Sequence, residues 1–182
     1  MKDMFARRLL LLFCLTLFFA CDMKQKLQEE IKTDWKTFET DEYSVKYPPD
    51  WLVNTSGYKG TSFLIISKQT SIRDFYQENV SLMEEELSDS MDLVRYIDQS
   101  ISIIRDTVVQ FEIIKDSLWA NDPIYYHQLI FQGQEGINKI TSEKYYISKN
   151  HKVYELTFSG KTLEQSRYLP IGEGIMNSFR IK

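Results

Sequence analysis

Two histidines are the side chains of this chain best suited to acid–base or metal chemistry near neutral pH. His127 lies in the run Tyr125–Leu129, which reads as part of a strand, and His151 lies in a polar segment between two strand-like runs. A zinc site or a serine hydrolase would need further signals, but the chain has no HExxH motif, no repeated His spacing and no G-x-S-x-G motif. We therefore expect an ordinary sheet residue at His127, an exposed turn at His151, no catalytic residue and no metal ligand.

Acidic residues gather in one segment, at Glu84–Glu86, Asp89 and Asp92. Ca²⁺ prefers such oxygen ligands, but the glycine and the ligand spacing of a calcium loop are missing. Consecutive strand residues also point to opposite faces of a sheet, which would separate the three glutamates. We expect a solvated strand end followed by helix capping, with a cation site as the alternative.

Aromatic residues are abundant, and adjacent tyrosines in a strand place one ring on each face of the sheet. We expect one ring of each pair to be in the core and its neighbour to be exposed, where a row of rings could bind a glycan or a protein. Core packing is the simpler interpretation. The residues concerned are Trp35, Trp51, Trp119, Tyr125, Tyr126, Tyr145 and Tyr146.

Composition excludes several classes of partner. The chain has 22 basic and 26 acidic residues, a net charge of −4, and no basic stripe, which argues against nucleic-acid binding. Only seven glycines are present and none forms a phosphate-binding loop, so neither a nucleotide nor another cofactor is expected.

The N-terminus has the order of an export signal: Lys2, Arg7 and Arg8 precede an apolar run over residues 9–20. That run is too short to span a bilayer, which takes roughly 20 apolar residues. We predict a signal peptide over residues 1–20.

Ala20 followed by Cys21 resembles the lipobox of bacterial lipoproteins, in which a peptidase cuts before an acylated cysteine. Phe18 and Phe19 stand where that pattern prefers Leu and a small residue. The alternative is cleavage by the general signal peptidase, but no A-x-A site lies nearby. We predict cleavage between Ala20 and Cys21 and lipidation of Cys21, so that the acyl chains of Cys21 hold the protein at the membrane.

Residues 21–34 are predicted to be the lipid anchor and a polar tether, and residues 35–182 one globular domain. Cys14 lies in the predicted signal and Cys21 would be acylated, so the mature domain would hold no free thiol. Its stability must then come from apolar packing rather than from disulfides.

The pattern after residue 38 predicts strands, a long helix, more strands and a closing helix. Residues 91–106 form the predicted first helix, with Val94, Ile97, Ile101 and Ile104 as its apolar face and an N-cap at Ser88–Ser90. The second helix lies within residues 162–177, where Pro170, Gly172 and Gly174 are expected to break, start or weaken it. The expected strands are 43–47, a centrally placed 63–66, 79–86, 111–118, 124–132, 139–148 and 153–159. Residues 178–182 are expected to end the chain as a short strand or a tail.

This order predicts an α+β fold, an antiparallel sheet flanked by helices. With this order of elements the chain resembles the PsbP-like domain family, named for the extrinsic protein of photosystem II and common among bacterial lipoproteins. The likeness spans roughly residues 38–182 and is carried by Tyr43–Trp51, by the long helix after Ser90 and by Ile175–Ile181. It implies an α/β/α sandwich without catalysis, which acts in the assembly or retention of membrane complexes.

The expected function is therefore that of a non-enzymatic, lipid-anchored protein of the bacterial cell envelope, facing the periplasm or the exterior. It would dock onto a protein partner in a membrane-associated complex. The alternative is a small-ligand or glycan binder, which a deep pocket lined by Trp119 and several tyrosines would favour. A hydrolase comes third, and it would need His127 to touch a serine and a carboxylate in one cleft.

Overall fold

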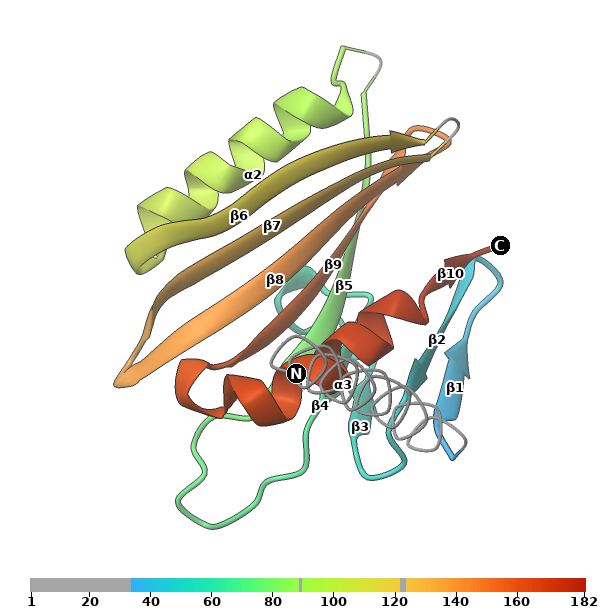
Figure 1. Cartoon of the computed structure of the whole chain (residues 1–182). Helices are drawn as coiled ribbons and strands as arrows, with labels where there is room; N and C mark the ends of the chain where they lie inside the picture. Colours follow the sequence, from blue (N-terminus) through green and yellow to red (C-terminus); the bar gives the residue numbers. More distant parts are fainter. Residues whose placement is uncertain (1–33, 89, 122–123) are drawn as a thin grey trace, which may run out of the picture. The chain divides into compact units, whose positions relative to one another are not determined.

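The computed structural model describes residues 34–88, 90–121 and 124–182, in which residues 37–182 form a compact unit. The strands form two sheets (Figure 1). The smaller sheet has the order β1-β2-β10, and the larger has the order β3-β4-β5-β9-β8-β7-β6, with antiparallel pairing between neighbours in the larger sheet. The strands are β1 (Lys36–Glu39), β2 (Tyr43–Tyr47), β3 (Leu52–Asn54), β4 (Phe63–Ile66), β5 (Asn79–Glu86), β6 (Val109–Asn121), β7 (Ile124–Glu135), β8 (Asn138–Lys149), β9 (Lys152–Lys161) and β10 (Arg180–Ile181).

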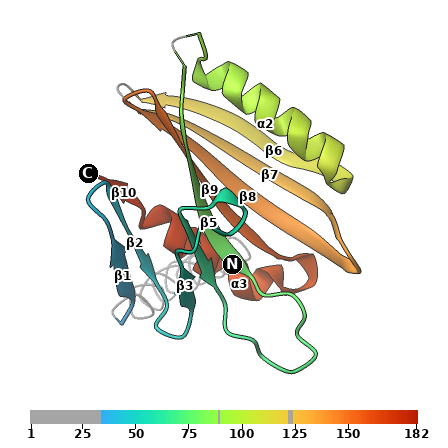
Figure 2. The same cartoon turned by 180° about the vertical axis from the view of Figure 1, so that it is seen from behind.

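Two helices pack on opposite faces of the larger sheet: α2 (Leu93–Thr107) and α3 (Gln165–Asn177) (Figures 1 and 2). Strand β9 shows this directly, because its residues alternate between the two faces. Val153 belongs to the cluster under α2, whereas Phe158 contacts Gly172 of α3. The described residues also include two single-turn 3-10 helices, η1 (Tyr58–Gly60) and η2 (Thr162–Glu164). The predicted α+β class is confirmed.

Asp92 is the N-cap of helix α2, and its side chain accepts a hydrogen bond of 2.9 Å from the Arg95 backbone N–H. The expected cap at Ser88–Ser90 was therefore a few residues early. One member of the predicted apolar face was also wrong: Val94 is 53% exposed, and its neighbour Leu93 is buried instead. The other predicted members of that face, Ile97, Ile101 and Ile104, are buried.

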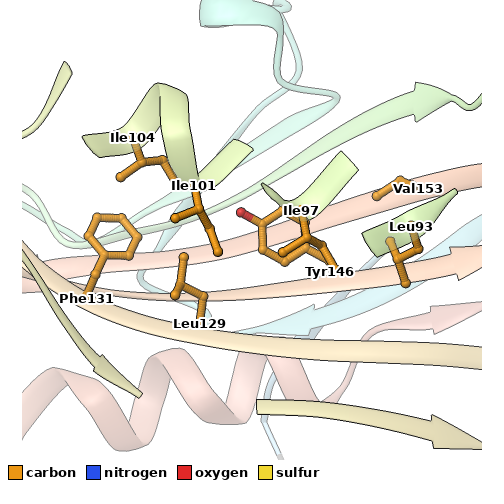
Figure 3. Packing of buried hydrophobic residues seen from close by; sticks show 8 residues of the cluster. All are labelled: Leu93, Ile97, Ile101, Ile104, Leu129, Phe131, Tyr146 and Val153. Atoms are coloured by element: carbon orange, nitrogen blue, oxygen red, sulfur yellow. The ribbon is translucent and has the colours of Figure 1, made fainter. Parts of the chain in front are cut away.

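The core under α2 joins its apolar face to the strands below (Figure 3). Isoleucines from successive turns of the helix lie over rings and branched side chains of β7, β8 and β9. Such burial contributes about 1.5–3 kcal/mol for each large apolar side chain. The cluster consists of Leu93, Ile97, Ile101, Ile104, Leu129, Phe131, Tyr146 and Val153.

Helix α3 differs from its sequence-based expectation. It continues through Pro170 and Gly172 without a break. A Cβ atom added at Gly172 would lie only 2.3 Å from Cδ2 of Phe158, so the bare backbone here lets the helix approach the sheet. The glycine thus serves packing, and contact with the sheet supports a helix that its local sequence disfavours.

Two expectations about burial in the sheet were also wrong. Strand β4 is second from one edge of its sheet rather than central; Phe63 and Ile65 are buried and Leu64 and Ile66 are half-buried. Tyr145 and its neighbour Tyr146 are 7% and 0% exposed, so both rings are buried instead of one. The face of Tyr146 is covered by α2.

Candidate functional site

A groove of about 480 Å³ runs along one flank of α2, between this helix, the end of β5 and the sheet beneath. We call it the α2 groove. Its apolar walls come from Met83, Leu87, Met91, Ile103 and Ile104; its other lining residues are Glu85, Glu86, Ser88, Tyr96, Gln99, Ser100, Lys144 and Glu155. Helix α2 packs its buried apolar face on the sheet. The adjacent face of the helix, which carries Tyr96, Ser100 and Ile103, lines the groove.

An ion pair lies on the sheet side of the groove. The Lys144 Nζ is 2.5 Å from an oxygen of Glu155, and the two side chains are only 12% and 8% exposed. They come from neighbouring strands, β8 and β9. Taking two charges out of water is costly, so a pair of this kind needs further polar partners.

Tyr96 and Tyr146 supply those partners. The Tyr96 hydroxyl donates to Glu155 and also contacts Glu85 at 3.0 Å, so one phenol joins two strands. The Lys144 Nζ lies over the Tyr146 ring at 5.4 Å from its centroid. Burial, then the hydrogen bond to Glu155 and the charge of Glu155, raise the pKa of Tyr96, which keeps the hydroxyl protonated and able to donate.

This arrangement suits binding. The apolar walls can take up aliphatic side chains or chains of similar size, and three carboxylates face a single lysine, so the groove attracts cationic groups. Ser88 and Gln99 add hydrogen-bonding groups to the lining, whereas the Ser100 hydroxyl already bonds the Tyr146 hydroxyl at 2.8 Å. The groove therefore fits a segment that carries apolar side chains next to Lys or Arg.

His127 lies in β7 beneath α2, outside the lining of the groove. It is 4% exposed, and its Nε2 is 2.7 Å from Oδ1 of Asp116. Its Nδ1 is buried and has no hydrogen-bond partner among the described residues. The carboxylate of a triad is thus present and the serine is not, so the arrangement that would indicate a hydrolase is missing here. His151 lies in the exposed hairpin turn between β8 and β9, as expected, with a φ of 60°.

The acidic segment is divided between the two faces of the sheet. Glu84 pairs with Lys152 at 2.6 Å, whereas Glu85 contacts Tyr96 in the α2 groove. Asp92 caps α2, and Asp89 lies outside the described residues. Within the described ranges, no group of three or more His, Cys, Asp or Glu side chains could hold a metal ion.

The α2 groove does not match the aromatic pocket expected for a glycan or small-ligand binder. The α2 groove has one aromatic lining residue, Tyr96. Tyr126 and Tyr145 instead form an edge-to-face pair, with centroids 4.9 Å apart, on the face away from α2. For Trp119 in β6 and Tyr125 in β7 the structure describes the backbone and not the side chain.

Sequence reasoning missed Lys144 and Glu155. Strand alternation alone places Lys144 on the same face as Tyr146, and Glu155 on the same face as Val153. A lysine and a glutamate at matching parity in adjacent strands could have suggested a cross-strand pair. Nothing in the sequence, however, shows that α2 covers that face.

The predicted lipidation site, Cys21, and the cleavage site after Ala20 lie outside the described residues. Within residues 34–88, 90–121 and 124–182, none of the helices has the length and apolar character needed to cross a membrane.

Solved structures share this fold at low sequence identity. Cyanobacterial PsbP (CyanoP) from Synechocystis sp. PCC 6803 aligns over 81% of this chain and 92% of its own, with a TM-score of 0.62 and 15% identity. The chain has a PsbP-like fold. LpqN, described as involved in cell envelope biogenesis of Mycobacterium tuberculosis, aligns over 82% of this chain and 91% of its own, with a TM-score of 0.61 and 10% identity.

The same fold occurs in the Ran-binding protein Mog1p of Saccharomyces cerevisiae. It aligns over 81% of this chain and 95% of its own, with a TM-score of 0.52 and 9% identity. No family model matches the sequence, and no curated protein matches it either. At these identities the likeness shows the fold, and function has to be argued from the site.

Proposed function

We propose that this chain is a non-enzymatic, lipid-anchored protein of the bacterial envelope that docks onto a membrane-associated protein through the α2 groove. The observation that carries this proposal is the lining of the groove, apolar walls beside a buried ion pair and two further carboxylates. The partner segment would place aliphatic side chains between the walls and a Lys or Arg near Glu85 and Glu86.

Two of the structural neighbours support a binding role for the fold. Mog1p is described as Ran-binding, and LpqN is described as involved in envelope biogenesis. Both descriptions fit a domain that acts through its surface. Within the described residues His127 has a carboxylate partner and no serine, which gives no support to a hydrolase.

The membrane part of the proposal rests on Cys21. Two or more acyl chains on this cysteine would hold the domain at the bilayer permanently, because each buried CH₂ contributes about 0.8 kcal/mol. Mass spectrometry of the mature protein tests this part: the N-terminus should be an acylated Cys21. An unmodified N-terminus, or one that begins elsewhere, would contradict it.

Cross-linking in cells followed by pull-down tests the docking. Ile103→Lys puts a cation on the apolar wall, where it should repel a basic partner and reduce its capture. The matched control is Val94→Lys on the same helix, because both side chains are exposed and only Ile103 lines the groove. Cys21→Ala should also reduce capture by releasing the protein from the membrane. Equal capture of the partner by Ile103→Lys and Val94→Lys would show that the groove is not the docking site.

A small-ligand binder is the second candidate, and the size of the groove is what favours it. A volume of about 480 Å³ lies in the range of small-molecule sites. Native mass spectrometry of the purified chain distinguishes the two. A small molecule that is bound by Val94→Lys and not by Ile103→Lys would favour ligand binding over protein docking as the function of the groove.

A further inference from the structure

Four large apolar side chains project into solvent at one end of the domain. They are the most exposed apolar side chains of the described residues: Ile72 (88%), Phe75 (85%), Ile137 (92%) and Leu163 (97%). Three turns supply them, namely the loop between β4 and β5, the β7–β8 hairpin and η2. We call these four residues the tip cluster. In Figure 1 the three turns lie together at the lower left.

Lys161 at the end of β9 shows that these turns are neighbours. Its Nζ is 3.0 Å from Asp74, next to Phe75, and 3.1 Å from Glu164, next to Leu163. Lys161 also pairs across the sheet with Ile140, three residues from the hairpin tip at Ile137. Lys161 therefore connects the bases of all three turns, two through its ammonium group and the hairpin through its backbone.

The loop between β4 and β5 buries the carboxylates of Asp74 and Glu78 and exposes its apolar side chains, Ile72 and Phe75. Asp74 is 9% exposed and accepts hydrogen bonds of 3.0 and 2.9 Å from the N–H and hydroxyl of Thr70. Tyr76 bonds Ser159 of β9 at 2.8 Å, which fixes the loop to the sheet. Phe75, between these two anchored residues, points away from the protein. Its exposure is thus imposed by the hydrogen bonds on either side of it.

Exposed cations outnumber exposed acids at this end, although the whole chain carries −4. Lys68, Arg73 and Lys139 are exposed beside the tip cluster, and the Arg167 side chain is 63% exposed next to η2. The acids that face them are Glu135, which is exposed, and Glu164, which is 37% exposed and pairs with Lys161. The buried Asp74 contacts Lys161. Protruding apolar residues among exposed cations match the surface of an anionic bilayer, where apolar tips enter the interface and Lys or Arg meet the headgroups.

We propose that the tip cluster is a membrane-contacting edge that inserts into anionic lipid surfaces. Side chains that stand apart on separate turns would need separate pockets on a protein partner, whereas a bilayer accepts them without matching shape. The contact would orient the domain and leave the α2 groove, on the flank of α2, free for its partner. The tip cluster would thus make a second membrane contact, separate from the lipid anchor and formed by the folded domain itself.

Site-specific fluorescence on the full chain tests this edge. Phe75→Cys and Leu163→Cys, each in a Cys14→Ser background, are labelled with an environment-sensitive dye and reconstituted into vesicles. The vesicles contain phosphatidylcholine alone or an equal mixture with phosphatidylglycerol. Val94→Cys and Leu52→Cys are the controls, because both positions are exposed and lie outside the tip cluster. The unsubstituted background reports any label on Cys21 and so tests the anchor separately.

With phosphatidylglycerol present, the two tip labels should shift to shorter wavelength and be quenched by lipids that carry a spin label in their acyl chains. The control labels should do neither. Arg73→Glu together with Lys139→Glu should reduce the shift. The proposal is overturned if tip labels emit as in water in both vesicles, if tip and control labels shift equally, or if the charge reversals have no effect. A shift seen in native membranes and absent in vesicles would also overturn it and would indicate a protein partner.

Discussion

The ion pair between Lys144 and Glu155 gives the sharpest energetic prediction. Lys144→Met leaves Glu155 buried with only the Tyr96 hydroxyl as an observed polar partner, and Glu155→Leu leaves Lys144 over the face of the Tyr146 ring. Removing one member of a buried pair costs about 3–5 kcal/mol. The loss should lie at the lower end for Lys144→Met, because Glu155 keeps a hydrogen bond, and at the upper end for Glu155→Leu.

The double variant should behave differently. With both charges gone, no uncompensated ion remains, and apolar replacement of a buried pair is often close to neutral. Lys144→Met with Glu155→Leu is therefore expected within about 1–2 kcal/mol of the native chain, far less than the sum of the single losses. Urea unfolding followed by circular dichroism measures the cycle, with Val94→Ala as the exposed control. Additive single losses, or single variants as stable as the double, would refute this reasoning.

Three further predictions concern packing, capping and pH. Gly172→Ala should destabilise the fold by about 1–3 kcal/mol through overpacking, despite the better helix propensity of Ala, and Phe158→Leu should partly restore stability in urea unfolding; no coupling between the two would contradict the contact. Asp92→Ala should cost about 1 kcal/mol in the same assay, and Asp92→Asn much less. Hydrogen bonds from the Thr70 N–H and from Lys161 lower the pKa of Asp74 from 3.8 to about 2. The ionised carboxylate therefore stabilises the fold above about pH 4, and this stabilisation is lost as the pH falls from about 4 to about 2. Asp74→Asn should remove that pH dependence, and unchanged acid sensitivity would contradict it.

The sequence predicted the fold well where one local signal decides the structure. Alternation and turn residues placed the four strands from β6 to β9 as successive hairpins, and period-three-and-four spacing placed α2. Short polar connections left no room for crossover helices, so antiparallel order followed directly. These features depend on neighbours within a few residues.

The misses depend on neighbours that are distant in the chain. Steps of three and four fit both Leu93 and Val94 before Ile97, and only the position of the sheet shows which of the two is buried. Gly172 was expected to break, start or weaken its helix, since its packing partner, Phe158, comes from β9 and is distant in the chain. In each case the three-dimensional partner decided the outcome.

The candidate site could not be predicted for the same reason. Lys144 stands between Glu143 and Tyr145, in a strand whose outward and inward faces cannot be distinguished without knowing where α2 lies. The net charge of the chain was equally uninformative about the tip cluster, since an average over 182 residues conceals an end where exposed cations outnumber exposed acids. Loop residues such as Phe75 carry no periodic signal at all.

Photo-cross-linking in intact cells tests the docking of the α2 groove most directly. A photoreactive amino acid at Met83, which is 42% exposed and lines the groove, is compared with the same group at Val94, which lies outside it. The groove account predicts a discrete cross-linked protein from position 83 that is absent from position 94 and lost when Ile103→Lys is added. The same products from both positions, or none from position 83, would contradict it.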